Sequence, residues 1–263
     1  MIDLHCHILP AFDDGAATLQ DALAMAEVAF KDGIRQIVAS PHLGGVMGYE
    51  RAYHIAEAVA LLNQELKQLG ISVEVIGGPE VAVSEDIPKR LDEGYPLTVG
   101  GAGKYLLLEP PYQNLPLCTG QVVFELLARG VTPIITHPER ALEIQRSPDL
   151  LATLAERGAL GQITGSSVIG ALGPRAKATA ETMLRHGLAH FIATDAHSWK
   201  ARPPVLARAV ETARRLLGDQ AAHVLVEDNP ALVLRGERVP SMPVTIKRRQ
   251  SGWQAIWRRV RGS

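Results

Sequence analysis

The sequence predicts an α/β protein in which parallel strands form a barrel and helices cover its outside. Short apolar runs rich in β-branched residues alternate with longer helical patterns, and seven such units follow one another. The length of 263 residues also suits a single barrel domain. The seven units favour a barrel, although their spacing leaves an open sheet as the alternative.

The expected strands lie at residues 2–4, 34–39, 72–76, 105–108, 132–136, 160–164 and 190–194. Helices between them are marked by their end residues. Thr18 and Asp21 form a capping-box pattern before the first helix, and Gly33 ends that helix. Further helices are expected at 49–70, 119–130, 147–158 and 173–187, the last of which starts at Pro174.

Composition and charge exclude several classes of protein. The net charge of −1 argues against a protein that binds nucleic acid over its whole surface. The two cysteines, Cys6 and Cys118, form no disulfide framework and suit a reducing cytoplasm. No signal peptide is expected, because polar residues interrupt the N-terminal stretch, and no apolar run approaches the roughly 18 residues of a membrane span.

Two parts of the chain differ in charge, and we expect a barrel domain at residues 1–240 and a basic, flexible tail at 241–263. The tail has six basic residues and no acidic one, so it carries a charge of +6. Because the formal net charge of the whole chain is −1, residues 1–240 carry −7. Trp253, Ile256, Trp257 and Val260 would share one face of a helix. This pattern predicts a tail that is disordered alone and orders on an anionic membrane surface or an acidic kinase tail. The alternative is a tail without a partner, either disordered or packed on the barrel.

Residues that can bind metal ions follow six of the seven expected strands. They are His5, His7 and Asp14 after the first strand, His42 after the second, Glu80 after the third, Glu109 at the end of the fourth, His137 after the fifth, and Asp195 and His197 after the seventh. Because the carboxyl ends of parallel strands open onto one face of a barrel, we expect these side chains to converge. The sixth strand brings no obvious ligand, and its glycine and serine residues leave room for substrate.

This number of ligands predicts two or three divalent ions. Imidazole and carboxylate together suit manganese, iron, zinc or cobalt without selecting one of them. Glu80 and Asp195 could each bridge two ions, and ions about 3.5–4 Å apart can promote a hydrolytic displacement. The remaining histidines lie within helical patterns or at a strand start, and we expect His54, His186, His190 and His223 to be surface or core residues that bind no metal.

The motifs DLHCH, SPH, GGPE, LLLEPPY, HPER and TDAH together resemble those of the polymerase-and-histidinol-phosphatase (PHP) superfamily. The stretch HCHILPAFDDGA resembles more closely the bacterial PHP-type protein-tyrosine phosphatases encoded with capsule and exopolysaccharide genes. The resemblance covers residues 1 to about 236. It implies a distorted (β/α)7 barrel and manganese-favoured hydrolysis of phosphotyrosine on a membrane-associated tyrosine autokinase or its substrates.

The resemblance also implies roles for individual residues. It assigns one ion to His5, His7, Glu80 and Asp195, a second to Glu80, Glu109 and His137, and a third to Asp14, His42 and His197. Many histidinol phosphatases carry histidine in place of Asp14 and Glu109, so these two residues favour the tyrosine-phosphatase branch. Arg140 and Arg202 resemble the phosphate-binding arginines, and a planar guanidinium suits phosphate geometry.

The sequence lacks the motifs of several other enzyme classes. Cysteine-based phosphatases need an arginine six positions after the cysteine, where this chain has Phe12 and Phe124. A serine-hydrolase elbow and a phosphate-binding glycine loop are also missing from the sequence. The alternatives that remain are another PHP phosphoesterase acting on a small ester or nucleic acid, and a metal-binding regulatory protein with little turnover.

Overall fold

The computed structural model describes residues 1–45, 48–240 and 242–246. Its strands pair only in parallel within this part of the chain, and they form two sheets. The first sheet contains, in order, β1 (Ile2–Cys6), β2 (Gln36–Ala39) and β4 (Glu74–Gly77). The second contains β3 (His42–Leu43), β5 (Glu80–Ala82), β6 (Tyr105–Glu109), β7 (Thr132–Thr136), β8 (Leu160–Thr164) and β9 (Phe191–Ala193).

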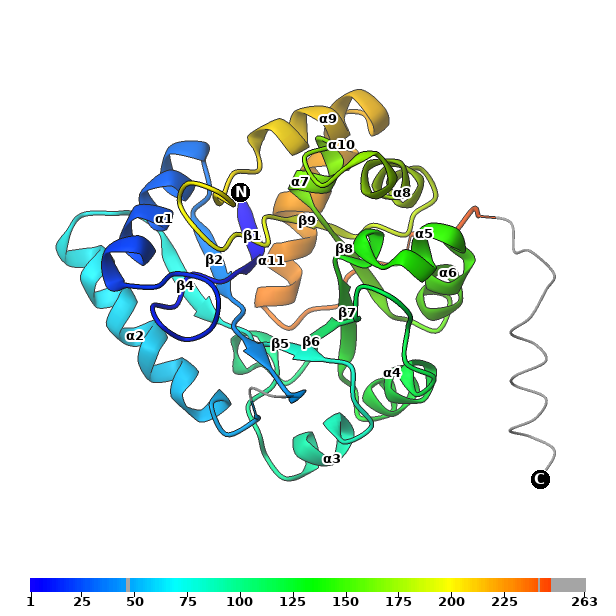
Figure 1. The fold of residues 1–263 in the computed structure, drawn as a ribbon, viewed down its shortest axis with the longest axis horizontal. Coiled ribbons are helices and arrows are strands. Elements are labelled where there is room, and N and C mark those ends of the chain that lie inside the picture. The colour runs from blue at the N-terminus through cyan, green and yellow to red at the C-terminus, as the bar shows by residue number, and fades with distance from the viewer. Residues whose placement is uncertain (46–47, 241, 247–263) are drawn as a thin grey trace.

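The two sheets together make one distorted barrel with helices outside it (Figure 1). The short strands β3 and β5 directly follow β2 and β4 along the chain, after interruptions at Pro41 and Pro79. At the other edge, the chain beyond β9 returns to β1, where the backbone N–H of Asp195 donates to the carbonyl of His5 at 2.8 Å. The predicted α/β barrel class is thus confirmed.

All seven predicted strands are present, and residues 132–136 and 160–164 match β7 and β8 in full. The sequence did not predict β3 and β5, because the prolines that precede them remove a backbone donor and end an apolar run. In consequence His42 and Glu80 are strand residues, paired in register with each other, and not loop residues after a strand.

Helices cover the outer side of the barrel, except α11 (Asn229–Leu234), which packs against the apolar cluster inside it (Figure 1). In the described ranges they are α1 (Leu19–Asp32), α2 (Ala52–Gln68), α3 (Ile87–Asp92), α4 (Thr119–Ala128), α5 (Leu142–Arg146), α6 (Asp149–Ala155), α7 (Gly165–Val168), α8 (Pro174–Arg185), α9 (Ala207–Leu217), α10 (Asp219–His223) and α11 (Asn229–Leu234), with 3-10 turns η2 (Val99–Gly101) and η3 (Pro138–Arg140) and a π-helical turn η4 (Val224–Asp228).

The predicted first helix is confirmed in detail. Thr18 and Asp21 form the capping box, and Gly33 ends α1 in the left-handed conformation with φ 95°. The helices after β9 were not predicted. In α9 the buried residues are Ala209, Val210 and Ala213, so its buried side consists of small side chains.

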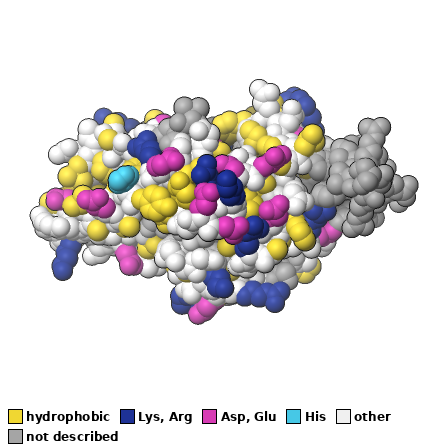
Figure 2. All heavy atoms as spheres, turned by 90° about the horizontal axis from the view of Figure 1, so that it is seen from below, with side chains coloured by type: hydrophobic (Ala, Val, Ile, Leu, Met, Phe, Trp, Pro, Cys, Tyr) yellow, Lys and Arg dark blue, Asp and Glu magenta, His cyan; other side chains and the backbone are white. Residues whose placement is uncertain are grey.

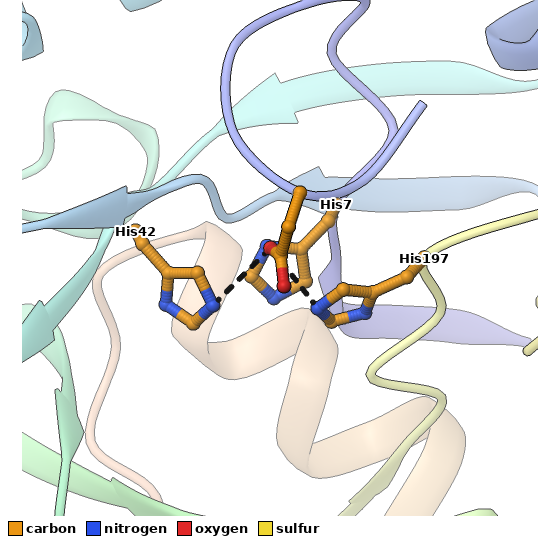
Figure 3. Close-up of side chains that lie close together, drawn as sticks. His7, His42 and His197 are labelled. Carbon is orange, nitrogen blue, oxygen red and sulfur yellow. Dashed lines mark ion pairs between the residues drawn. The ribbon is translucent and has the colours of Figure 1, made fainter. Parts of the chain in front are cut away.

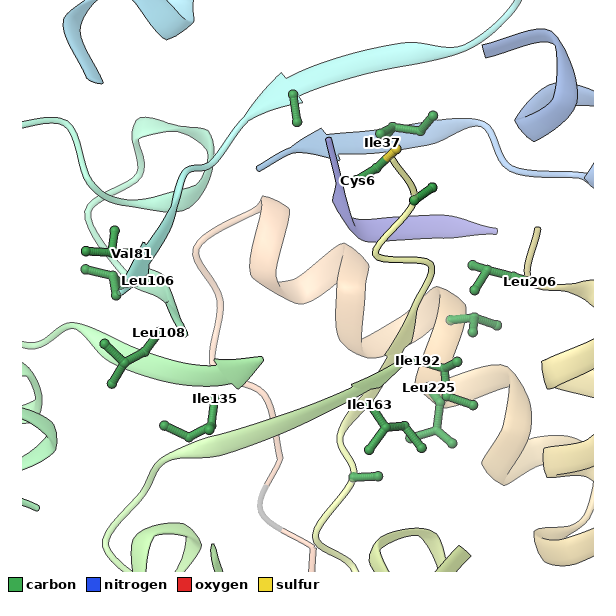
Figure 4. Close-up of a cluster of buried hydrophobic side chains, with 14 of the residues drawn as sticks. Cys6, Ile37, Val81, Leu106, Leu108, Ile135, Ile163, Ile192, Leu206 and Leu225 are labelled. Carbon is green, nitrogen blue, oxygen red and sulfur yellow. The ribbon is translucent and has the colours of Figure 1, made fainter. Parts of the chain in front are cut away.

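Alternating strand residues divide the core into two clusters. Leu106 and Leu108 of β6 point outward, into a cluster shared with the helices (Figure 4). Leu107 lies in the other cluster, which contains Val233 of α11. Because apolar side chains and α11 fill the interior near the amino ends of the strands, polar side chains gather at the carboxyl ends.

His190 lies in the core just before β9, and its neutral ring should make stability depend on pH. It is 3% exposed, and its Nδ1 accepts a hydrogen bond from the backbone N–H of Gly161 at 3.1 Å. Burial lowers its pKa from 6.5 to about 4. The unfolded chain therefore binds this proton first, and we expect stability to fall by up to about 3 kcal/mol as the pH drops from 6.5 to 4.

Urea unfolding of the wild type and of His190→Asn at several pH values tests this expectation. Asparagine can keep an acceptor near Gly161 but does not titrate, so the variant should lose this part of the acid dependence. An identical slope in both proteins would assign the dependence to other groups.

On the face seen from below Figure 1, basic and acidic side chains lie close together (Figure 2). Ion pairs on α3 and α4 are of this kind, such as Arg129 with Asp92 at 2.8 Å and Arg90 with Glu93 at 3.1 Å. A mixed face of this type offers no continuous positive strip to a nucleic-acid backbone.

The chain after the barrel runs along its surface. His186 Nδ1 lies 2.8 Å from the hydroxyl of Thr245, and Val244 and Ile246 pack against the outer core cluster. The predicted tryptophan-bearing helix in residues 253–260 lies outside the described residues. Within the described ranges, no helix is both long and apolar enough to cross a membrane.

Candidate metal centre

The structure brings all nine of the predicted metal ligands together at the carboxyl ends of the strands. They come from β1 and the loop after it, from β3, β5 and β6, and from the turns that follow β7 and β9. His7, His42 and His197 point toward one another although 190 positions separate the first from the last (Figure 3). The convergence that the strand-end rule predicted is therefore present in the fold.

His5 and His7 face a common point. Their Nε2 atoms lie 3.1 Å apart, while their Nδ1 atoms are directed at Gln162 Oε1 (3.0 Å) and Asp13 Oδ2 (2.7 Å). A Nδ1 that donates to such an acceptor leaves the Nε2 lone pair free. When the rings are neutral, both Nε2 lone pairs face the same point and could bind one cation there, so this donor set fits a metal ion.

Glu80 lies at the centre of the cluster and is fully buried. Its Oε2 is 3.3 Å from His5 Nε2 and 3.1 Å from His42 Nδ1, and its Oε1 is 3.1 Å from His137 Nε2. No donor among the described residues is aimed at Oε2 with hydrogen-bond geometry. A buried carboxylate oxygen of this kind is costly unless a cation binds it, which again fits a metal ion.

A further group lies nearer the solvent. Asp14 Oδ1 is 3.5 Å from His42 Nε2 and 3.4 Å from His197 Nε2, and His7 belongs to the same group of potential ligands (Figure 3). His42 also faces inward, with Nδ1 3.3 Å from Glu109 Oε2. His7 and His42 thus each lie near two groups of potential ligands, although the resemblance assigned each of them to one ion.

The charges of the cluster favour cations. Burial alone would raise the pKa of Glu80, but the charges of His5 and His137 outweigh it and hold that pKa well below its usual range. Burial is also outweighed at Asp195, where a hydrogen bond from His7 and nearby histidine charges lower the pKa. In return, the Glu80 carboxylate raises the pKa of His5 to about 9 against the effect of burial. The carboxylates thus remain ionised and attract positive charge.

The two arginines singled out in the sequence meet at Asp195. Arg140 Nη1 donates to Asp195 Oδ2, and Arg202 Nη2 donates to the same oxygen at 2.7 Å and to the Asp195 carbonyl at 2.9 Å. The other carboxylate oxygen, Oδ1, lies 3.5 Å from His7 Nε2. One carboxylate oxygen of Asp195 therefore faces the metal-ligand cluster, and the other accepts from the guanidinium groups of Arg140 and Arg202.

Two of these residues have an unusual backbone. His137 (φ 33°) and Asp195 (φ 51°) adopt the left-handed region that side chains other than glycine rarely occupy. Such conformations persist where the surrounding structure fixes them, and they are frequent at functional sites. Here they turn the chain sharply after β7 and β9, so that both side chains face the cluster.

Sequence reasoning missed the residues that orient the ligands. They include Gln162 on β8, the strand expected to bring no ligand, and Thr136, whose hydroxyl donates to Glu80 Oε1 at 2.5 Å. Gly15 is also needed, because a Cβ there would lie 2.0 Å from the carbonyl oxygen of His7. The stretch DDGA places Asp13 directly before the predicted ligand Asp14, and this adjacency could have indicated that Asp13 also belongs to the site.

Asp13→Ala is expected to weaken metal binding about 10–100-fold without removing a ligand. The Asp13 carboxylate holds His7 through Nδ1 and accepts the backbone N–H groups of Gly15 (2.9 Å) and His42 (3.0 Å). Burial opposes its charge, but the hydrogen bond from His7 lowers its pKa to about 2. Titration calorimetry with Mn²⁺ measures the change. Asp13→Asn, which keeps an acceptor, should lose less, and equal affinity in all three proteins would contradict the role.

Comparison with known proteins gives one family and a consistent set of relatives. Residues 1–235 match the family described as "Capsular polysaccharide synthesis, CpsB/CapC". The chain is 36% identical to tyrosine-protein phosphatase YwqE of Bacillus subtilis, over 95% of this chain and 98% of the relative. It is 33% identical to putative tyrosine-protein phosphatase CapC of Staphylococcus aureus, over 96% and 98% of the two chains.

A solved structure agrees with these matches. It belongs to work on YwqE from Bacillus subtilis and CpsB from Streptococcus pneumoniae, described as unique metal-dependent tyrosine phosphatases. It superposes with a TM-score of 0.90 at 35% identity and covers 95% of this chain and 100% of its own. A lactonase from Listeria monocytogenes, with a TM-score of 0.56 at 13% identity over 90% and 95% of the two chains, shares the fold alone.

Proposed function

This chain belongs to the CpsB/CapC family of capsular polysaccharide synthesis, and we propose that it is a metal-dependent protein-tyrosine phosphatase. The observation that carries the proposal is the position of Asp195, between the ligand cluster and the guanidinium groups of Arg140 and Arg202. The phosphatases that the chain resembles over nearly its whole length support the same function.

We assign the metal ions to three groups of side chains. His5, His7, Glu80 and Asp195 would hold one ion, Glu80, Glu109 and His137 a second, and Asp14, His42 and His197 a third, with His7 and His42 near more than one group. Manganese is proposed as the metal, and iron, zinc or cobalt are the alternatives. Bound ions of this type supply Lewis acidity and lower the pKa of a water molecule toward neutrality.

Arg140 and Arg202 would bind the phosphate group. One N–H group of each arginine donates to the same oxygen of Asp195. A phosphate oxygen could accept from these two N–H groups in place of that carboxylate oxygen. A guanidinium fork matches phosphate in shape and offsets the charge that develops on its equatorial oxygens. Their fixed positions would hold the phosphoryl group against the ligand cluster, with the rest of the substrate toward the solvent.

The substrate is proposed to be a phosphotyrosine protein of capsule or exopolysaccharide synthesis, in particular a membrane-associated tyrosine autokinase. The basic tail at 241–263 would bring the enzyme to such a substrate or to an anionic membrane, and this part rests on the sequence alone. Binding to anionic vesicles and to an acidic kinase peptide, by the full chain and by a form that ends at Pro240, tests it. Equal binding by both forms at low salt would remove the tail from the function.

Phosphate release tests the activity. The full chain, stripped with chelator and reloaded with Mn²⁺, is compared on a phosphotyrosine peptide, histidinol phosphate and a DNA end. Preference for the peptide supports the proposal. Preference for either other substrate would make the protein another phosphoesterase, and metal binding without turnover on all three would make it a regulatory protein.

A further inference from the structure

Tyr112 lies beside the proposed phosphate site, and none of the roles above uses it. Its ring is stacked on His137, with ring centroids 5.8 Å apart and planes at 26°. The guanidinium carbon of Arg140 lies 4.6 Å from the Tyr112 ring centroid. Tyr112 is nevertheless 48% exposed, so a large part of an aromatic ring remains open to solvent next to the arginine that would bind phosphate.

The position of the ring is fixed by the backbone. Tyr112 comes three residues after Glu109, and its carbonyl accepts the backbone N–H of Leu142 at 2.8 Å. The next carbonyl, of Gln113, accepts the N–H of Glu143 at 3.0 Å, and the Glu143 carboxylate accepts the N–H of Leu115 at 2.7 Å. The segment after β6 is therefore attached to the chain that follows Arg140, and the ring is held in place before substrate arrives.

The hydroxyl of Tyr112 does not explain this position. In the described part of the chain, no hydrogen bond to that hydroxyl is present, whereas Tyr105 donates to the carbonyl of Glu237 at 2.5 Å and Tyr49 to Asp86 at 2.9 Å. What Tyr112 offers at this place is the ring itself. An exposed ring favours offset or edge-on contact with a second aromatic ring.

We propose that Tyr112 is a specificity-determining residue, whose exposed ring contacts the aryl ring of a phosphotyrosine when Arg140 and Arg202 hold the phosphate. The inference rests on the proposed function and adds how the site distinguishes aryl from alkyl phosphate esters. A phosphoserine held by the same arginines has no ring at this distance from phosphorus. It would gain the phosphate contacts but not the aromatic contact.

Steady-state kinetics of Tyr112→Ala and Tyr112→Phe, loaded with Mn²⁺, test the inference on one peptide sequence that carries either phosphotyrosine or phosphoserine. For Tyr112→Ala we expect kcat/KM on phosphotyrosine to fall about 10-fold, mainly through KM, with the phosphoserine value unchanged. Tyr112→Phe keeps the ring and should match the wild type. Tyr53→Ala is the matched control, because Tyr53 is 54% exposed on α2 and outside the site.

Direct binding of two phosphonates, measured by titration calorimetry, does not depend on turnover. The wild type should bind phenylphosphonate more tightly than methylphosphonate, and Tyr112→Ala should lose that difference while keeping its metal content. An equal loss on both peptides and both phosphonates would show that Tyr112 only positions Arg140 or His137, and no loss would also overturn the inference. Failure of the wild type to hydrolyse phosphotyrosine would instead refute the proposed function.

Discussion

Replacement of Glu80 or His137 by alanine is expected to reduce phosphotyrosine hydrolysis below detection and to leave the barrel folded. Glu80 is the carboxylate nearest the centre of the cluster, within 3.3 Å of nitrogen atoms from His5, His42 and His137. Its removal leaves the facing histidines without a shared counter-charge, so the ions that need it would no longer bind. The apolar core lies elsewhere and would be unaffected.

Metal content by elemental analysis, phosphate release and circular dichroism, measured on the same samples, check this result. His54→Ala is the matched control, since His54 lies on α2 outside the cluster and should keep full activity. Chelation of the wild type should have the same effect as the substitutions, and Mn²⁺ should reverse it. Full activity in protein shown to contain no metal would end the metal hypothesis.

Arg140→Ala and Arg202→Ala are each expected to lower kcat about 10²–10³-fold with the metal content unchanged. Both side chains donate to Asp195, yet neither supplies a metal-binding atom, so the loss should lie in the binding of phosphate charge in the transition state. Lysine at either position should restore only part of the rate, because a single ammonium cannot reproduce the planar fork.

Arg146→Ala provides the matched control for the arginine variants. Arg146 is exposed at the end of α5, six residues beyond Arg140. Among the described residues, the arginines that form ion pairs with Asp195 are Arg140 and Arg202. It should keep the wild-type rate and its salt dependence. Normal rates in both Arg140→Ala and Arg202→Ala would mean that another group binds the phosphate.

The sequence was sufficient to predict the barrel class and the convergence of nine side chains, because both follow from the order of elements. A residue just after a parallel strand must lie at one end of the barrel, whatever the details of packing. Thus the order of strands and helices along the chain is enough to bring Glu109 and His137 to the same end of the barrel.

Contacts that depend on side-chain direction could not be predicted in this way. Gln162 lies within β8, where only the orientation of the strand decides that it meets His5 and not the outer core. Tyr112 follows two prolines in an irregular segment, and hydrogen bonds to the chain after Arg140 decide its place. Helix α9 was missed for a local reason, since its buried residues, Ala209, Val210 and Ala213, are small.

The join between β1 and the chain after β9 has a consequence for the order of events during synthesis. His5 and His7 leave the ribosome first, but Asp195 and His197, which share their site, appear nearly 190 residues later. The site can therefore assemble only when the last strand closes on the first. Ions bound there would hold the two ends of the barrel together, and by mass action they would stabilise the finished fold and not its precursors. Metal supply in the cell would then set the fraction of newly made chains that are closed.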